Sequence, residues 1–358
     1  MGRFLMIDIG AGTMDVLYYD TESDLHYKAV VKSPVQHVAE DAESLTGNLL
    51  VTGNEMGGGP ISSVLRQRAQ SADVVMTPSA AATLNHSLEK VQSWGIKIAE
   101  SSEIESLRKS NRYAGLTLGD LQVGRLRKIV ESFGVPFSFD AVGICAQDHG
   151  VPDKGVSHLD WRHNIFQAIL DKDPFPHALL YRRDEIPATM NRLVSIADAA
   201  DTLPANEVYV MDSGIAAILG ASMDTLTKSK EKILILDMAT SHTLGAALED
   251  GEIAGFFEYH TRDITISRLE SLLHGLADGE LRHEKILEEG GHGVYMRKAF
   301  GFDNAEIILA TGPKRKLIEN SLLPIMFGSP LGDNMMTGTV GVLEAVRKRK
   351  GLKLISYL

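Results

Sequence analysis

Residues 4–19 constrain the fold of this chain more than any other stretch. An apolar run enters Asp8 and is followed by a short turn with two glycines, Gly10 and Gly12, and the hydroxyl of Thr13. The run predicts a strand buried on both faces, and a second apolar run after the turn predicts an antiparallel partner. Glycines let the N–H groups of such a turn converge on an anion, and the Asp8 carboxylate can organise a hydrated magnesium ion beside it. The alternative is an ordinary glycine-containing hairpin, because short glycine motifs recur by chance.

The same pattern returns in the second half of the chain. Residues 233–237 are again an apolar run that ends in a carboxylate, Asp237, and another apolar run follows at 244–248. The turn between the two runs carries three hydroxyl side chains, those of Thr240, Ser241 and Thr243. This coarse duplication predicts two lobes, each organised around one hairpin.

Composition excludes several classes of function. The 358 residues suggest two domains, and the net charge of −11 argues against general nucleic-acid binding. No apolar run approaches the roughly 18–20 residues of a membrane span, and no signal-peptide pattern precedes the first strand. The single cysteine, Cys145, excludes an internal disulfide and fits a reducing cytoplasm. None of the 12 histidines forms the helical pair with a carboxylate that is typical of a metal motif, so we expect no histidine metal site.

Two further predicted strands end in polar side chains. Residues 140–146 predict a buried strand, and the side chains that follow it are those of Gln147, Asp148 and His149. Asp212 ends another short strand, at the start of a small-residue helix over 213–221. Open α/β sheets bind ligands at the carboxyl ends of their strands, so these side chains are candidates for a substrate pocket.

A run of three glycines precedes a predicted helix over about 61–70. The glycines are Gly57, Gly58 and Gly59. Since the N-terminus of a helix presents unpaired N–H groups, this loop can bind an anion or a substrate. A flexible loop is the alternative, and the sequence leaves both open.

Five segments occur in the order used by the actin, heat-shock-70 and sugar-kinase superfamily, and the sequence resembles that superfamily on these segments. They are 8–13 and 237–243 for two phosphate loops, 212–221 and 332–341 for two connecting helices, and 308–312 for an adenosine segment. The resemblance implies an α/β fold of two ribonuclease-H-like lobes with a nucleotide cleft between them. The implied units are an N-terminal lobe over 1–205 with an inserted α/β unit at about 40–130, a C-terminal lobe over 206–335, and a closing helix and tail over 336–358.

The resemblance implies ATP and Mg²⁺ as ligands. One phosphate turn from each lobe would grip the polyphosphate, and Asp8 and Asp237 would hold its magnesium ion. The residues implied for cofactor binding are Asp8, Gly10, Gly12, Thr13, Asp237, Thr240, Ser241, Thr243, Thr311 and Gly312. The second turn has Met238, Ala239 and His242 where heat-shock and activator ATPases have glycines, so its hydroxyls would replace backbone donors.

Within the superfamily the sequence resembles the carbohydrate-kinase branch most. Residues 143–150 are similar to a substrate-side strand of those kinases, and residues 239–241 to their Gly-Thr-Ser phosphate loop. Asp212 falls where those kinases place a general base, and Asp148 is a second candidate catalytic carboxylate. The alternative for Asp212 is a helix N-cap, a position that aspartate favours. The implied substrate residues are Gln147, His149, Gly57, Gly58 and Gly59.

Three functions from different classes are left open. The chain transfers the γ-phosphate of ATP to a small hydroxylated metabolite, or it is an ATPase switch acting on a partner protein, or it senses a nucleotide or metabolite without turnover. The sequence is also similar to a family labelled as activators of pyruvate formate-lyase. A radical-type activator needs a three-cysteine cluster motif, which a chain with one cysteine lacks. We expect a small-molecule substrate, no nucleic acid or membrane partner and a cytoplasmic location, with a protein partner and a homo-oligomer left open.

Overall fold

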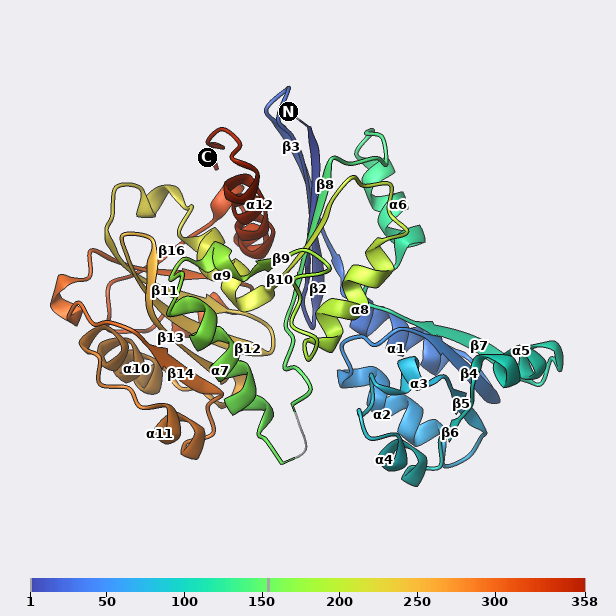
Figure 1. The fold of residues 1–358 in the computed structure, drawn as a ribbon. Helices are drawn as coiled ribbons and strands as arrows, with labels where there is room; N and C mark the ends of the chain where they lie inside the picture. Colours follow the sequence, from blue (N-terminus) through green and yellow to red (C-terminus); the bar gives the residue numbers. More distant parts are fainter. Residues whose placement is uncertain (1, 153–154, 358) are drawn as a thin grey trace.

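The computed structural model describes residues 2–152 and 155–357 of the chain. Two six-stranded sheets form separate lobes that helices join, and a smaller four-stranded sheet stands apart beside the N-terminal lobe (Figure 1). The expected two-lobed α/β architecture with an inserted unit is therefore confirmed. The boundaries of the predicted units stay predictions, and Met1, residues 153–154 and Leu358, which those units include, lie outside the described residues.

The N-terminal sheet has the strand order β3-β2-β1-β8-β10-β9. Its strands are β1 (Arg3–Ile9), β2 (Thr13–Asp20), β3 (Leu25–Lys32), β8 (Ala141–Ala146), β9 (Leu180–Tyr181) and β10 (Val208–Asp212). The first three form an antiparallel meander, β8 and β10 continue parallel to β1, and β9 closes the edge in the antiparallel sense. The helices α6 (Val123–Ser132) and α8 (Asn191–Ala200) lie on one side of this sheet (Figure 1).

The C-terminal sheet repeats this pattern in the order β14-β13-β12-β11-β15-β16. Its strands are β11 (Lys232–Met238), β12 (His242–Glu249), β13 (Glu252–His260), β14 (Gly293–Met296), β15 (Ile307–Thr311) and β16 (Ile325–Phe327). The helices α10 (Ile266–Asp278) and α11 (His283–Glu288) lie outside it (Figure 1). Again an antiparallel meander is followed by two parallel strands, so each lobe has the ribonuclease-H-like arrangement.

The two hairpins that organise the lobes also share their turn geometry. The Gly10 amide donates a hydrogen bond to the Thr13 carbonyl over 3.0 Å, and the Ala239 amide donates to the His242 carbonyl over 3.1 Å. Both central strands are buried on both faces, as the apolar runs predict, and the Leu5 and Leu234 side chains are 0% exposed. Each run therefore places its terminal aspartate at the same edge of its own sheet.

The inserted unit has its own core. Its parallel sheet, in the order β6-β5-β4-β7, consists of β4 (Asn48–Gly53), β5 (Val74–Met76), β6 (Lys97–Ile98) and β7 (Tyr113–Leu118). Its helices are α1 (Pro34–Ser44), α2 (Gly59–Arg68), α3 (Pro78–Ala81), α4 (Leu88–Ser93) and α5 (Ser101–Lys109). Val35 and Val38 of α1 pack with Leu49 and Val51 of β4, which makes α1 part of this unit. Three of the helices begin with proline in the first turn, where its missing N–H costs nothing.

Three helices link the two lobes. α7 (His158–Leu170) follows the N-terminal strand β8 in the chain but packs against β14 of the C-terminal lobe. α9 (Ser213–Ala221) and α12 (Thr337–Lys350) cross between the sheets (Figure 1). The short 3-10 helices are η1 (Pro176–Leu179), η2 (Thr225–Thr227), η3 (Thr261–Asp263), η4 (Phe302–Asn304), η5 (Arg315–Ile318), η6 (Pro330–Gly332) and η7 (Asn334–Met336). No helix in the described ranges is long and apolar enough to cross a membrane.

The crossing of α9 and α12 depends on two glycines. A Cβ atom on Gly220 would lie 1.8 Å from the Thr337 carbonyl oxygen, and one on Gly341 would lie 1.8 Å from the Ala216 carbonyl oxygen. The two helix backbones are therefore in direct contact, and no other residue type fits at either position without separating the helices.

Gly220→Ala is expected to lower the free energy of unfolding by about 1–3 kcal/mol, because overpacking a close contact forces backbone shifts of that cost. Denaturant unfolding would measure the change. Gly124→Ala is the matched control, since Gly124 is also in a helix and a Cβ there meets nothing within 4 Å. That control should be neutral or stabilising by up to about 1 kcal/mol. Equal effects of the two substitutions would contradict the packing argument.

Candidate functional site

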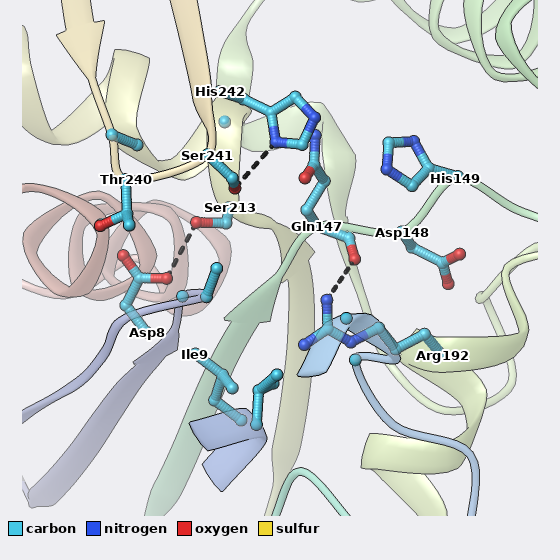
Figure 2. Close-up of a pocket in the computed structure, with 18 of the residues that line it drawn as sticks. Asp8, Ile9, Gln147, Asp148, His149, Arg192, Ser213, Thr240, Ser241 and His242 are labelled. Atoms are coloured by element: carbon cyan, nitrogen blue, oxygen red, sulfur yellow. Dashed lines mark hydrogen bonds between the residues drawn. The ribbon is translucent and has the colours of Figure 1, made fainter. Parts of the chain in front are cut away.

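A cavity of about 530 Å³ lies between the lobes. Both hairpin turns line it, together with the N-terminal ends of α9 and α12, the residues after β8 and two loops of the inserted unit. Figure 2 shows Asp8 and Thr240 facing each other at one end, with Gln147, Asp148 and His149 at the other. The structure thus brings the predicted phosphate turns and the predicted substrate residues to one cavity.

The two turns approach each other closely across this cavity. A Cβ atom on Gly12 would lie 3.2 Å from Thr240 Oγ1. Gly10, Thr13, Thr240 and Ser241 all line the cavity. Thr243 lies behind the turn instead, where it is buried and its Oγ1 is 3.1 Å from Thr261 Oγ1. The two turns therefore form opposite walls, with the hydroxyls of Thr240 and Ser241 on the side that lacks glycines.

Three carboxylates gather at the turns, and those of Asp15 and Asp237 are buried. Asp8 accepts a hydrogen bond from Ser213 Oγ over 2.8 Å, and Asp237 accepts one from Thr311 Oγ1 over 3.4 Å. Asp15 stands opposite Asp8 in the β1–β2 pairing, is 5% exposed, and its Oδ1 has no hydrogen-bond partner. Sequence reasoning missed Asp15, although its register opposite Asp8 follows from the predicted hairpin.

The carboxylates raise one another's proton affinity. Burial, followed by the charge of Asp8, raises the pKa of Asp15 to about 8 and that of Asp237 to about 7. Burial also raises the pKa of Asp8. Among the described residues, the side chains that donate hydrogen bonds to Asp8 and Asp237 are hydroxyls and not cations. Mg²⁺ prefers sites that are rich in anionic oxygen ligands. The chemistry of the donor set therefore fits the metal that the superfamily resemblance implies.

In metal-free buffer the free energy of unfolding is expected to fall as the pH rises from 6.5 to 8. The carboxyls of Asp15 and Asp237 have an ordinary pKa of 3.8 but values of about 8 and about 7 in the folded chain, so the folded state binds more protons in this window. The stabilisation is complete below the unfolded pKa and is lost as the pH passes the folded pKa. Urea unfolding with a chelator would measure the slope, which Asp15→Asn should flatten. A wild-type slope that is zero or positive would contradict the assignment.

Two glycines hold the terminal aspartates against neighbouring backbone. A Cβ on Gly338, in the first turn of α12, would lie 2.0 Å from Asp8 Oδ2. Gly312 has a φ of +85°, and a Cβ there would lie 2.7 Å from Asp237 Oδ1. Gly312 lines the cavity, whereas Thr311 is 0% exposed and contributes only through its bond to Asp237. The predicted adenosine segment is therefore adjacent to the carboxylates.

The two candidate catalytic aspartates are both engaged in structural bonds. Asp212 caps α9, with Oδ1 accepting from the Gly214 and Ile215 amides over 3.0 and 3.3 Å. Asp148 accepts from the Gly150 amide over 2.7 Å and from the Leu193 amide over 2.9 Å. Asp148 lines the cavity but Asp212 does not. The geometry favours the N-cap alternative for Asp212, and each oxygen of Asp148 already accepts one backbone hydrogen bond.

A buried ion network that the sequence did not reveal joins the lobes at the wall of the cavity. Arg162 of α7 donates to Asp212 Oδ2 over 2.9 Å and to Glu258 Oε2 over 2.5 Å. Gln147 Nε2 donates to Glu258 Oε1 over 2.5 Å. Burial alone would raise the pKa of Glu258, but the charge of Arg162 and neighbouring histidines hold it well below its usual range. Gln147 is thus held by the C-terminal lobe although it follows a strand of the N-terminal lobe.

The other predicted substrate residues lie around the wide end of the cavity. Gly57, Gly58 and Gly59 line it. A Cβ on Gly57 would lie 2.8 Å from the Val35 side chain, and one on Gly58 would lie 2.6 Å from the Thr83 carbonyl oxygen. This loop is therefore closely packed and not a loosely held, flexible loop. Arg192 of α8 donates to both oxygens of Asp120 and to the Gln147 carbonyl, which ties the inserted unit to the end of β8.

Comparison with known proteins gives one family and distant structural similarities. The family model described as "Putative pyruvate format-lyase activating enzyme (DUF1786)" matches residues 56–317. No protein with a curated description matches the chain. A Bacteroides thetaiotaomicron protein with an actin-like ATPase fold and unknown function is 8% identical, with a TM-score of 0.34 over 91% of this chain and 90% of that one. A Streptomyces griseus ROK-family glucokinase solved with glucose and AMPPNP is 11% identical, with a TM-score of 0.36 over 97% of this chain and 99% of that one. The family match covers most of the sequence, and the chain therefore belongs to the DUF1786 family.

Proposed function

We propose that the chain binds Mg²⁺–ATP in the cavity between its lobes and transfers the γ-phosphate to a small hydroxylated acceptor. The observation that carries this proposal is the meeting of two equivalent hairpin turns, with Asp8, Asp15 and Asp237, at one cavity. These carboxylates would hold a magnesium ion that neutralises the polyphosphate charge, and the turn amides and hydroxyls of both lobes would bind the polyphosphate from opposite sides. Closure of the lobes would exclude water from the reacting groups.

The wide end of the cavity supports a hydroxylated acceptor. His149 and Asn85 face this end, and His86 Nε2 lies 2.8 Å from Glu55 Oε1. The hydrogen bond that His86 donates to the Glu55 carboxylate raises the pKa of His86. Neutral and charged hydrogen-bonding groups of this kind suit a polyol or sugar-like ligand. Phosphoryl transfer passes through a loose transition state that depends on positioning, so the engagement of Asp212 and Asp148 in structural bonds does not exclude it.

The second candidate is an ATPase switch that acts on a partner protein. The Arg162 network and the glycine crossing of α9 and α12 favour it, because both couple the state of the cavity to the relative position of the lobes. The family description names pyruvate formate-lyase activation. The radical chemistry of such an activator needs a three-cysteine cluster motif, and the only cysteine in the sequence, Cys145, is buried. We therefore do not propose that chemistry.

Calorimetry with ATP and ADP, with and without Mg²⁺, tests the shared part of both candidates. We expect ATP to bind only when Mg²⁺ is present, and absence of binding would overturn both. Release of ADP in the presence of a panel of hydroxylated metabolites then separates them. Stimulation by one metabolite, with a phosphorylated product, supports transfer to a small acceptor. Slow hydrolysis that no metabolite stimulates but a protein fraction does supports the switch.

A further inference from the structure

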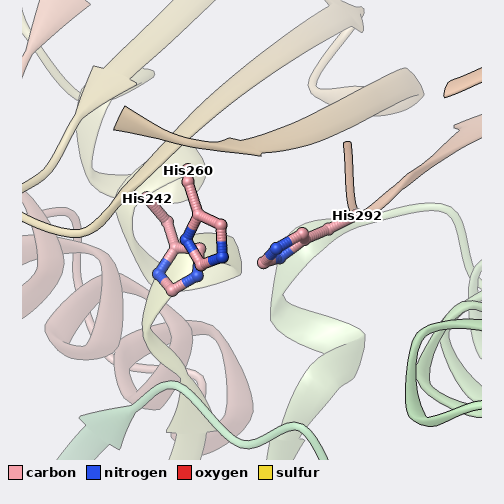
Figure 3. A group of neighbouring side chains, drawn as sticks. All are labelled: His242, His260 and His292. Carbon is pink, nitrogen blue, oxygen red and sulfur yellow. The ribbon is translucent and has the colours of Figure 1, made fainter. Parts of the chain in front are cut away.

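Three histidines of the C-terminal lobe converge at the rim of the cavity (Figure 3). His242 begins β12 and His260 ends β13, and the two residues are direct partners in the antiparallel pairing. His292 comes from the segment immediately before β14, the next strand of the same sheet. One ring nitrogen from each residue lies within 4.8 Å of the others. The sheet register therefore builds this group, although the three residues lie far apart in the sequence.

Two of the ring nitrogens form no hydrogen bond. His242 Nε2 and His292 Nδ1 are buried and form no hydrogen bond. The other nitrogen of His242, Nδ1, is 3.0 Å from Ser241 Oγ, which fixes the ring and leaves Nε2 free. An unsatisfied buried polar atom costs about 1–3 kcal/mol, so the free His242 Nε2 indicates a missing partner, whereas His292 Nδ1 has the Glu258 carboxylate 3.4 Å away. A neutral imidazole held by a hydrogen bond at one nitrogen is the usual form of a metal ligand.

We propose that His242, His260 and His292 bind a divalent transition metal, for which Zn²⁺ is the test ion. Imidazole nitrogens select Zn²⁺, Fe²⁺, Co²⁺ or Ni²⁺ over Mg²⁺, which prefers oxygen ligands. Zn–N bonds of about 2.0–2.1 Å in tetrahedral geometry place ligand nitrogens roughly 3.4 Å apart. The present separations of up to 4.8 Å close to that value by small rotations of the rings.

The surroundings suit a cation at this position. Glu258 Oε1 lies 3.4 Å from His292 Nδ1 and brings a buried negative charge beside the three rings. Because Glu258 also accepts from Arg162 and Gln147, the metal would be linked to the network that joins the lobes.

The position of the group also indicates what a metal there would contact. His242 lines the cavity, and the His149 ring from the N-terminal lobe has its centroid 5.7 Å from that of His242 and 6.0 Å from that of His292. Three protein ligands leave a coordination position for water or for an oxygen of a bound molecule. The site is separate from the aspartate group in its ligand chemistry and does not rest on nucleotide binding.

Metal binding by chelator-stripped protein without a histidine tag tests the proposal. Competition with a chromophoric chelator should show one equivalent of tightly bound Zn²⁺, which millimolar Mg²⁺ does not displace. Co²⁺ should give the visible absorption of a four- or five-coordinate site with nitrogen ligands. His260→Ala and His292→Ala should each weaken Zn²⁺ binding by at least about 100-fold, since loss of an outer-shell partner alone costs 10–100-fold. His37→Ala, in α1 of the inserted unit, should leave the affinity unchanged.

The outcomes separate this proposal from nucleotide binding. Asp237→Asn should lose Mg²⁺–ATP but retain Zn²⁺, so failure of one proposal leaves the other standing. If His260→Ala does not fold, the Zn²⁺ affinity of His260→Gln and the Co²⁺ spectrum of the unaltered protein test the same site. A six-coordinate Co²⁺ spectrum, or a Zn²⁺ affinity that is equal in the unaltered protein and both alanine variants, would overturn the site.

Discussion

Asp237→Asn is expected to lower magnesium-dependent turnover of ATP by at least about 100-fold, or about 2.7 kcal/mol of transition-state stabilisation. An amide cannot supply the negative charge that holds the metal on the polyphosphate. The same substitution should raise the free energy of unfolding of the metal-free protein at pH 8, because it removes one of three carboxylates that repel one another. Loss of activity together with a gain in stability cannot arise from misfolding.

The two measurements are steady-state ADP release and urea unfolding in chelator. Asp303→Asn is the matched control, since Asp303 is exposed and distant in sequence from both turns. That control should change neither quantity. If Asp237→Asn retained turnover, or lost activity and stability together, the assignment of Asp237 to a metal-binding group would be wrong.

Arg162→Ala is expected to lower the free energy of unfolding by about 3–5 kcal/mol, the usual cost of leaving buried charges without their partner. The side chains of Arg162, Asp212 and Glu258 are 7%, 2% and 4% exposed, so water cannot replace the guanidinium. Denaturant unfolding at pH 7 would measure the loss. Glu258→Gln in the same chain should restore part of it, because it removes one of the two stranded charges.

Arg183→Ala is the control for this prediction. Its ion pair with Asp198 has both side chains 48% exposed, and pairs of that kind contribute about 0–1 kcal/mol. If the two arginine substitutions had equal effects, the interlobe network would add nothing to stability. A loss confined to Arg162→Ala would support its role in fixing the lobes relative to each other.

The parts of the fold that could be predicted are those whose signal is local. An apolar run that ends in aspartate and a short turn specify β1 and β11 with their partners, since burial on both faces leaves a continuous apolar pattern. The duplicated hairpin then gives the two lobes. The inserted unit was also visible in outline, and α1, which begins at Pro34, packs in its core.

The parts of the site that were missed depend on contacts between distant segments. A strand-terminal aspartate before a helix can be a base or a cap, and for Asp212 the decision follows from Arg162, which no local pattern connects to it. In the sequence, Asp15 is a single polar residue within an apolar strand. Its relation to the site follows only from its pairing with Asp8. The three histidines become neighbours only through the register of β12 and β13 and the course of the chain before β14.

Gly220 and α12 are in direct contact, so an opening of the two lobes would pivot at this point. In a rotation about this contact, the displacement of each residue grows with its distance from the contact. Gly338 and the adjacent Asp8 would therefore move little, whereas His149 at the opposite rim of the cavity would move farther. The rings of His242, His260 and His292 ride on a single sheet and keep their spacing during such a swing. Opening of the lobes would then move His149 away from the three preassembled imidazoles, and closure would return it.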